Sequence, residues 1–225
     1  MKITFPLSSL LFCMTSVLVS ATYAQTARVS LKDASNEPVV GAVVEILLPT
    51  ELKSRYAIPE DKLVDQVDKE FLPSVSSLVV GSHISFPNYD DILHHVYSFS
   101  PVKTFNIPLY GTSESDNYRE SFETSGVVEI GCNIHDWMLA YIYVAESSKV
   151  AVTDEQGMAE ISDLPAGDYQ LKIWHSRLVR GQDALLQPLE LRVDSISEVN
   201  LIMELQRERR VRRAPSANRK RYRYR

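Results

Sequence analysis

The sequence predicts an all-β protein. Between residues 28 and 205, short runs of Val, Ile, Leu, Tyr and Phe alternate with turns rich in Gly, Pro, Asn, Asp and Ser, which is typical of many short strands joined into sandwiches or barrels. No stretch of convincing length repeats its apolar residues at helical spacing. With 44% hydrophobic residues among 225, the chain can bury the core of one large or two modest domains.

The first segment, residues 1–24, has the layout of a secretory signal peptide. Lys2 gives a positive start, an apolar run follows over about residues 7–19, and small residues lead to Ala24. We expect cleavage between Ala24 and Gln25, which makes the mature protein periplasmic. The alternative is a retained membrane anchor, but the apolar run is short against the roughly 20 residues of a membrane span.

The body of the chain then offers one strand-like run after another. Residues 49–66 interrupt the series, because they are polar and contain Pro49 and Pro59, and they are interpreted as a linker. The predicted strands are residues 29–31, 39–48, 71–80, 84–86, 94–99, 105–109, 126–130, 139–144, 150–152, 158–161, 169–174, 189–193 and 199–205.

The last segment, residues 206–225, is a basic tail. It holds ten Lys or Arg and one Glu, a charge of +9, so the rest of the chain must carry −14 to give the total of −5. With almost no aliphatic residues, the tail is expected to be disordered. In an exported protein it would contact anionic lipid or an acidic protein surface rather than nucleic acid; the alternative is a solvated tail without a specific partner.

Cysteine usage points to a metal. Cys13 leaves with the predicted signal peptide, so the mature chain keeps only Cys132. Cysteines normally pair in an oxidising compartment, and a lone one is a buried inert thiol, an intermolecular bridge or a metal ligand. His135 and Met138 follow Cys132 at intervals of three residues, and this spacing favours the metal ligand.

The metal that this donor set favours is copper. A thiolate, an imidazole and a thioether, completed by a second imidazole, form the two-His, one-Cys set with a weak axial Met that holds copper. Zinc accepts Cys and His, but Met is a poor zinc ligand. The second imidazole must come from His94 or His95, at the start of a predicted strand. Neighbouring strand residues point to opposite faces, so a regular strand presents only one of them.

Five motifs lie within residues 67–144, at residues 71–73, 78–81, 86–88, 94–96 and 126–144. Through these motifs the segment resembles the cupredoxins, the plastocyanin and amicyanin family, and in particular periplasmic proteins labelled methylamine-utilisation or plastocyanin-like. The resemblance implies a Greek-key β-sandwich, an electron-transfer role with a redox partner protein, and a copper site of His94, Cys132, His135 and Met138. Two positions depart from the family: His95 stands where Asn is usual, and Asp136 stands where amicyanin-like loops have Pro.

The flanking segments resemble two parts of one carboxypeptidase-regulatory-like sandwich. Residues 36–44 resemble its opening hairpin, and residues 153–157 and 164–169 resemble its later part. The first part alone offers too few strands for a stable sheet. We therefore expect a cupredoxin domain of about residues 62–145 inserted into a split immunoglobulin-like sandwich of residues 27–50 and 146–205. The alternative joins two sequential domains, with residues 27–50 added to the copper domain's sheet.

Three functions follow from these patterns. The first is a periplasmic one-electron carrier with a type 1 copper ion. The second is a copper carrier or buffer without a redox role, and the third is a non-redox interaction module. The sequence shows no Ser-His-Asp set, no catalytic carboxylate pair and no phosphate-binding loop, so an enzyme is not expected.

Overall fold

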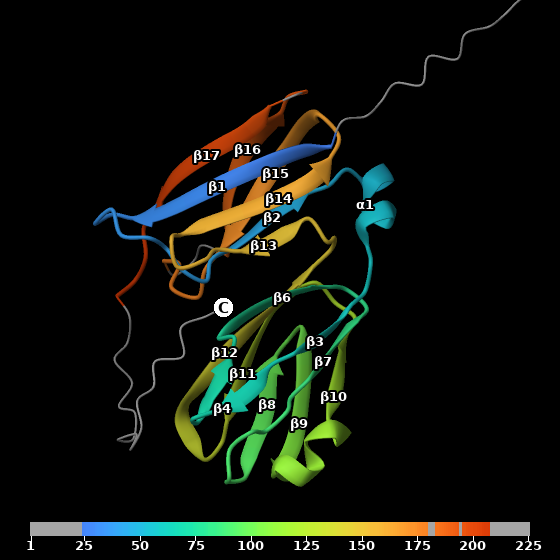
Figure 1. The fold of residues 1–225 in the computed structure, drawn as a ribbon, viewed down its shortest axis with the longest axis vertical. Helices are drawn as coiled ribbons and strands as arrows, with labels where there is room; N and C mark the ends of the chain where they lie inside the picture. Colours follow the sequence, from blue (N-terminus) through green and yellow to red (C-terminus); the bar gives the residue numbers. More distant parts are fainter. Residues whose placement is uncertain (1–23, 180–182, 194, 208–225) are drawn as a thin grey trace, which may run out of the picture.

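The structure is a computed structural model that describes residues 24–179, 183–193 and 195–207. Most of the structure is β-strand, which confirms the all-β prediction. The strands form two bodies, an upper and a lower one in the view of Figure 1. Among the described residues, no helix is long and apolar enough to cross a membrane. The predicted signal peptide and its cleavage site, and the basic tail beyond Arg207, lie outside the described residues.

The upper body consists of two sheets. In the first, β1 lies between β14, to which it is antiparallel, and β17, to which it is parallel. The second has the order β13-β2-β15-β16. Their bounds are β1 Gln25–Asp33, β2 Val43–Leu47, β13 Val150–Val152, β14 Met158–Leu164, β15 Gly167–Trp174, β16 Leu185–Leu191 and β17 Ile196–Met203.

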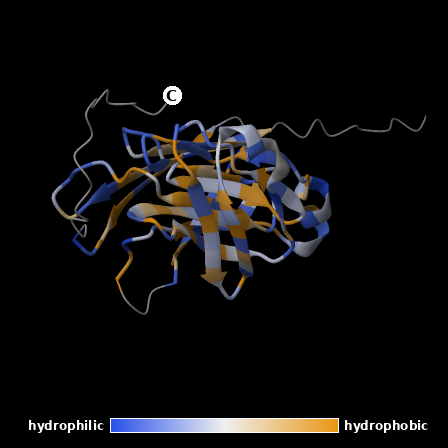
Figure 2. Cartoon of the chain, turned by 90° about the horizontal axis from the view of Figure 1, so that it is seen from below, coloured by the Kyte–Doolittle hydropathy of each residue, from blue (hydrophilic) through white to orange (hydrophobic). Residues whose placement is uncertain are grey.

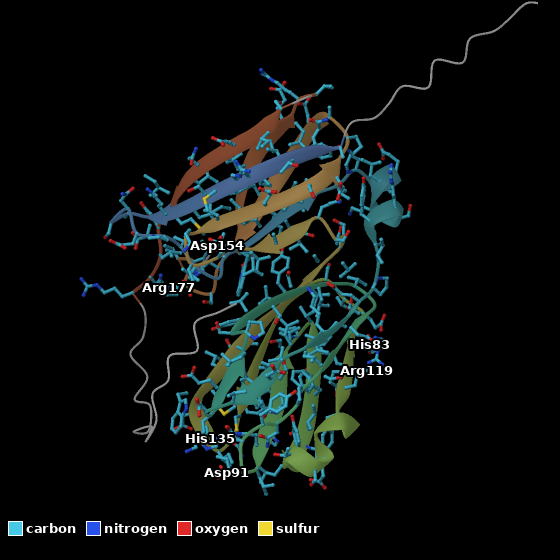
Figure 3. All side chains as sticks on the ribbon, in the orientation of Figure 1. His83, Asp91, Arg119, His135, Asp154 and Arg177 are labelled. Atoms are coloured by element: carbon cyan, nitrogen blue, oxygen red, sulfur yellow. The ribbon has the colours of Figure 1, made fainter. Side chains whose placement is uncertain are left out.

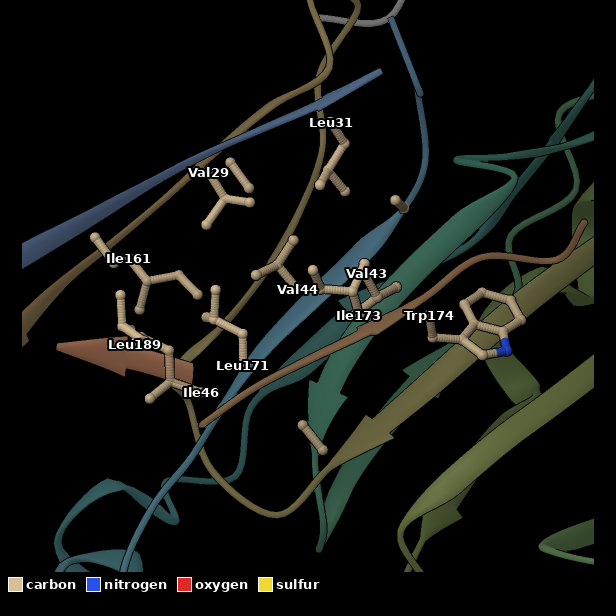
Figure 4. Packing of buried hydrophobic residues seen from close by; sticks show 14 of the residues in the cluster. Val29, Leu31, Val43, Val44, Ile46, Ile161, Leu171, Ile173, Trp174 and Leu189 are labelled. Atoms are coloured by element: carbon tan, nitrogen blue, oxygen red, sulfur yellow. The ribbon is translucent and has the colours of Figure 1, made fainter. Parts of the chain in front are cut away.

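The upper core includes one face of β1, along which buried residues alternate with more exposed ones. On β1 the side chains of Ala27, Val29 and Leu31 are fully buried, and the residues between them are not. This period of two places one face of the strand against the second sheet. Figure 4 shows the resulting cluster, with Trp174 at one edge of it.

The lower body holds a five-stranded sheet, β6-β12-β11-β8-β9, a three-stranded sheet, β10-β7-β3, and the hairpin β4-β5. Hydrophobic and hydrophilic residues alternate along its strands (Figure 2). Its separate core includes Cys132 and Met138. The bounds are β3 Asp61–Leu63, β4 Asp65–Val67, β5 Glu70–Leu72, β6 Val75–Val79, β7 Ser82–Ser85, β8 His94–Ser100, β9 Lys103–Tyr110, β10 Arg119–Phe122, β11 Gly126–Cys132 and β12 His135–Ala145.

The first two strands of the upper body, β1 and β2, pair with strands from the later part of the chain. β1 pairs with β14 and β17, and β2 pairs with β13 and β15, so both partner sets come after residue 145. The chain leaves the upper body at Tyr56 and returns at Ser148, whose N–H donates to the Tyr56 carbonyl at 2.7 Å. Exit and return therefore lie side by side, which is the geometry that an inserted domain requires.

The segment interpreted as a linker, residues 49–66, is more ordered than expected. It contains the short helix α1 (Thr50–Tyr56), the strand β3 and the first two residues of β4. Tyr56 explains the helix position, because its side chain is buried and its hydroxyl donates to the Asp163 carbonyl at 2.8 Å. β10 was also not predicted; its sequence is polar, and it becomes a strand by pairing with β7.

The two bodies meet along β12. Its far end contributes Tyr143 and Ala145 to the upper core, although the strand belongs to the lower sheet. The Tyr143 hydroxyl donates to Glu45 of β2 at 2.7 Å. Glu45 is only 3% exposed and also accepts a hydrogen bond from the Glu146 N–H at 3.1 Å. A buried carboxylate is costly unless it is hydrogen-bonded, so this contact stabilises the junction.

Replacing Tyr143 by Phe is expected to destabilise the folded protein by about 1.5–3 kcal/mol, the cost of losing a hydrogen bond to a buried charged group. The free energy of unfolding in urea, followed by circular dichroism, measures the loss. Tyr141→Phe is the control, because the Tyr141 hydroxyl meets Glu129, which is exposed, and its loss is expected to cost less. Equal costs for both variants would contradict a special role for Glu45.

Candidate metal centre

Three of the four predicted ligand residues converge at one end of the lower sheet. His94 begins β8, Cys132 ends β11 and His135 begins β12. Their ligand atoms all lie within 4.8 Å of one another. Cys132 Sγ lies 4.0 Å from His94 Nδ1 and 3.6 Å from His135 Nδ1. Figure 3 labels His135 at this end of the lower body.

Met138, the fourth predicted residue, lies three positions beyond His135 on β12. Its side chain is 2% exposed and belongs to the same core cluster as Cys132. Along β12 the side chains of Met138, Ala140 and Ile142 are buried, and Leu139 between them is exposed. The thioether is therefore on the buried face of the strand, the face that also carries Ala140 and Ile142 into the lower core.

The burial of residues along β8 shows which of His94 and His95 faces Cys132, a choice that strand geometry alone left open. On β8 the inward residues are His94, Val96 and Ser98, and His94 is completely buried. His95 is on the other face, where its ring lies 5.5 Å from that of Tyr97. The structure thus brings His94, and not His95, to Cys132.

The surroundings of Cys132 favour its thiolate. Burial raises the pKa of this thiol, but hydrogen bonds from His94 and from the backbone N–H groups of His95, Ile134 and His135 outweigh burial and hold the pKa below its ordinary value. The thiolate is the form that binds metals. The backbone N–H of His95, the residue that stands where Asn is usual in the cupredoxins, thus reaches the cysteine sulfur.

Asp90 is a site residue that the sequence did not reveal. Its Oδ2 lies 2.7 Å from Nε2 of His94, on the side of the ring that faces away from Cys132. Burial lowers the pKa of His94, but Cys132 and Asp90 outweigh it and raise the pKa. A carboxylate on one ring nitrogen orients the imidazole and leaves the other nitrogen for a metal. Asp90 sits in a loop without a motif, so only the fold could identify it.

The turn between β4 and β5 links the two histidines. Asp68 and Lys69 adopt left-handed backbone angles there, and their N–H groups donate to Asp90 at 2.7 and 2.9 Å. The Lys69 carbonyl accepts a hydrogen bond from the Trp137 indole at 3.0 Å, and the Trp137 ring lies 5.3 Å from that of His135. Both imidazoles are therefore braced through one turn.

The residues present fit a copper ion. Metal–sulfur and metal–nitrogen bonds of about 2.0–2.3 Å place three ligand atoms around one ion roughly 3.5–4 Å apart, which is the separation of Cys132 Sγ from the two Nδ1 atoms. Cys132 is a free, buried cysteine. The cluster found among the described residues contains no carboxylate ligand, whereas calcium and magnesium need oxygen donors.

Comparisons with known proteins give structural neighbours only. No protein-family model and no curated protein matches the chain. A Cu-containing nitrite reductase (NirK) from Thermus scotoductus SA-01 aligns with a TM-score of 0.35 and 26% identity over 39% of this chain and 22% of its own. A purple cupredoxin from Nitrosopumilus maritimus aligns with 0.34 and 22% over 38% and 100%, and an oxidized amicyanin variant with 0.34 and 18% over 38% and 82%. The solved structures similar to this chain thus include one described as copper-containing and one described as a cupredoxin.

Proposed function

We propose that this chain is a type 1 copper protein in which His94, Cys132 and His135 bind the ion and Met138 is the weak axial ligand. The observation that carries the proposal is the approach of two imidazole Nδ1 atoms to one buried thiol. Two imidazoles and a thiolate in a trigonal set, with a thioether nearby, are the donors of blue-copper electron-transfer sites.

The proposed activity is one-electron transfer. Copper supplies two oxidation states that differ by one electron. The protein's contribution is rigidity: His94 and Cys132 come from paired neighbouring strands, Asp90 orients one imidazole, and Trp137 packs against the other. Ligands that cannot move keep nearly the same geometry before and after the electron arrives, and hydrogen bonds to the Cys132 sulfur tune the potential.

The proposed place of action is the periplasm, and the proposed partner is a redox protein. Support comes from residues 1–24, which have the layout of a signal peptide. Mass spectrometry of the exported protein is expected to show a chain that starts at Gln25, either free or as the cyclised form. A mature protein that still carries Met1 would contradict export by cleavage.

The visible spectrum and the reduction potential of the copper-loaded protein test the proposal together. We expect one copper per chain, an intense thiolate-to-copper band and a reversible potential. A colourless protein that exchanges copper rapidly with a chelator would instead favour a copper carrier or buffer. If the protein takes up no copper, the third function, a non-redox interaction module, is favoured.

Replacing Met138 by Ala is expected to keep the copper and the colour but to shift the reduction potential, because the weak axial ligand tunes the potential while the other three donors hold the ion. Voltammetry measures the shift. Leu139→Ala is the control, since Leu139 is next in sequence but points outward and is 44% exposed. If both variants keep the wild-type potential, Met138 is a core residue and not a ligand.

A further inference from the structure

A second site lies at the junction of the two bodies, away from the metal centre. It is a pocket of about 450 Å³ between β11 and β12 of the lower body and β15 and the segment after it in the upper body. Sites for small ligands are about 300–1,000 Å³. One wall is aromatic: the Trp174 ring centroid lies 5.4 Å from that of Tyr141 and 6.1 Å from that of Tyr143.

The pocket has an excess of negative charge. Glu129 and Asp183 line it, and within the described part of the chain neither forms an ion pair. The cation in the lining, Lys172, is already engaged: its Nζ lies 4.0 Å from Glu45 and 5.5 Å from the centre of the Tyr143 ring. Burial and Arg177 lower the pKa of His175 to about 4, so its imidazole adds no positive charge at neutral pH.

The described chain ends beside this pocket. Gln206 donates its backbone N–H to the Arg177 carbonyl at 2.8 Å and its side-chain amide to the Leu178 carbonyl at 3.0 Å. Leu178 is part of the pocket lining. The residues that follow begin with Arg207 and include arginines at 209, 210, 212 and 213. An extended chain of three to seven residues spans about 10–25 Å, so these arginines can reach a pocket whose wall Gln206 already touches.

We propose that the junction pocket binds guanidinium groups of this chain's own C-terminal tail, residues 207–225. Nine of the ten basic residues of the tail are arginines. Arginine suits the pocket because its planar group stacks on aromatic rings and donates two parallel hydrogen bonds to a carboxylate. Each contact is weak by itself, but a tether of a few residues keeps the local concentration of the tail in the millimolar range, so the tail occupies the pocket without high affinity.

Photo-cross-linking in the full-length exported protein tests the proposal. p-Benzoylphenylalanine replaces Val211, in the middle of the first arginine group, and the protein is irradiated at low concentration. We expect cross-links within one chain to Tyr141, Trp174 or Leu178, mapped by mass spectrometry. The double variant Glu129→Gln/Asp183→Asn should lower their yield by roughly fivefold, the effect of losing two exposed ion pairs.

The matched control is Glu155→Gln/Asp168→Asn, which makes the same change of charge at two exposed positions that do not line the pocket, and its cross-link yield should equal that of the parent. Cross-links that join separate molecules, or that fall outside the pocket, would overturn the proposal. So would equal yields in the two double variants, or a tail that cross-links only when vesicles of anionic phospholipid are added. None of these outcomes depends on copper, so the copper proposal is tested independently.

Discussion

Replacing Cys132 by Ser is expected to abolish the visible absorption band of the copper-loaded protein. The band requires a thiolate bonded to copper, and the described structure holds a single free cysteine, Cys132. Serine has nearly the same shape, but its hydroxyl is a hard donor that stays protonated at neutral pH and does not favour copper. Copper affinity should also fall, because His94 and His135 would remain as the close donors.

Optical titration of wild-type and variant protein with copper measures both effects. Asn133→Ser is the matched control: it makes a change to the same residue type on the adjacent, exposed position of the same loop, and it should keep the band. Circular dichroism shows whether Cys132→Ser remains folded. A folded serine variant with the wild-type colour would refute Cys132 as the ligand.

Replacing residues 58–146 by a short Gly/Ser linker is expected to leave a folded upper body. The replaced segment starts and ends where Tyr56 and Ser148 are hydrogen-bonded to each other, so a short linker closes the gap without strain. The variant keeps both upper sheets, since their seven strands all lie outside the segment. It loses Tyr143 from the upper core, and removal of a buried aromatic residue costs about 3–5 kcal/mol.

We therefore expect a cooperative unfolding transition at a lower urea concentration than in the full chain. The reciprocal variant, which ends at residue 146, lacks the partners of β1 and β2 and should leave those strands unpaired. The split-sandwich interpretation is wrong if the linker variant is unfolded while the chain ending at residue 146 folds completely and binds copper.

The parts of this structure that could be predicted are those in which the residues that act together are close to each other in the sequence. Cys132, His135 and Met138 stand on one hairpin, so their spacing alone indicated a metal loop. Strand geometry alone reduced the second imidazole to His94 or His95, and only the resemblance favoured His94, because the choice depends on which face of β8 meets the core. Alternating apolar residues likewise predicted most strands.

The parts that could not be predicted depend on contacts between distant segments. Asp90 is only four residues from His94, but the hydrogen bonds that hold its carboxylate come from Asp68 and Lys69, more than twenty positions away. Lys69 in turn reaches Trp137 across 68 positions of sequence. Helix α1 could not be predicted because it is too short to show a repeat of apolar residues at helical spacing. Its position depends on Tyr56, whose carbonyl and hydroxyl form hydrogen bonds with residues 148 and 163. The junction pocket combines residues from both bodies, so no single motif encodes it.

The pairing of β1 with β17 has a consequence for the time course of folding. Every paired residue in these two strands is 170 positions from its partner, from Thr26 with Ile196 to Asp33 with Met203. β1 leaves the ribosome long before β17 and must therefore wait for it before their sheet can close. Residues 61–145 contain all the strands of their own sheets and can fold during that wait. Because contacts between distant segments form slowly, the lower body should be complete, and able to take up metal, while the upper body is still open.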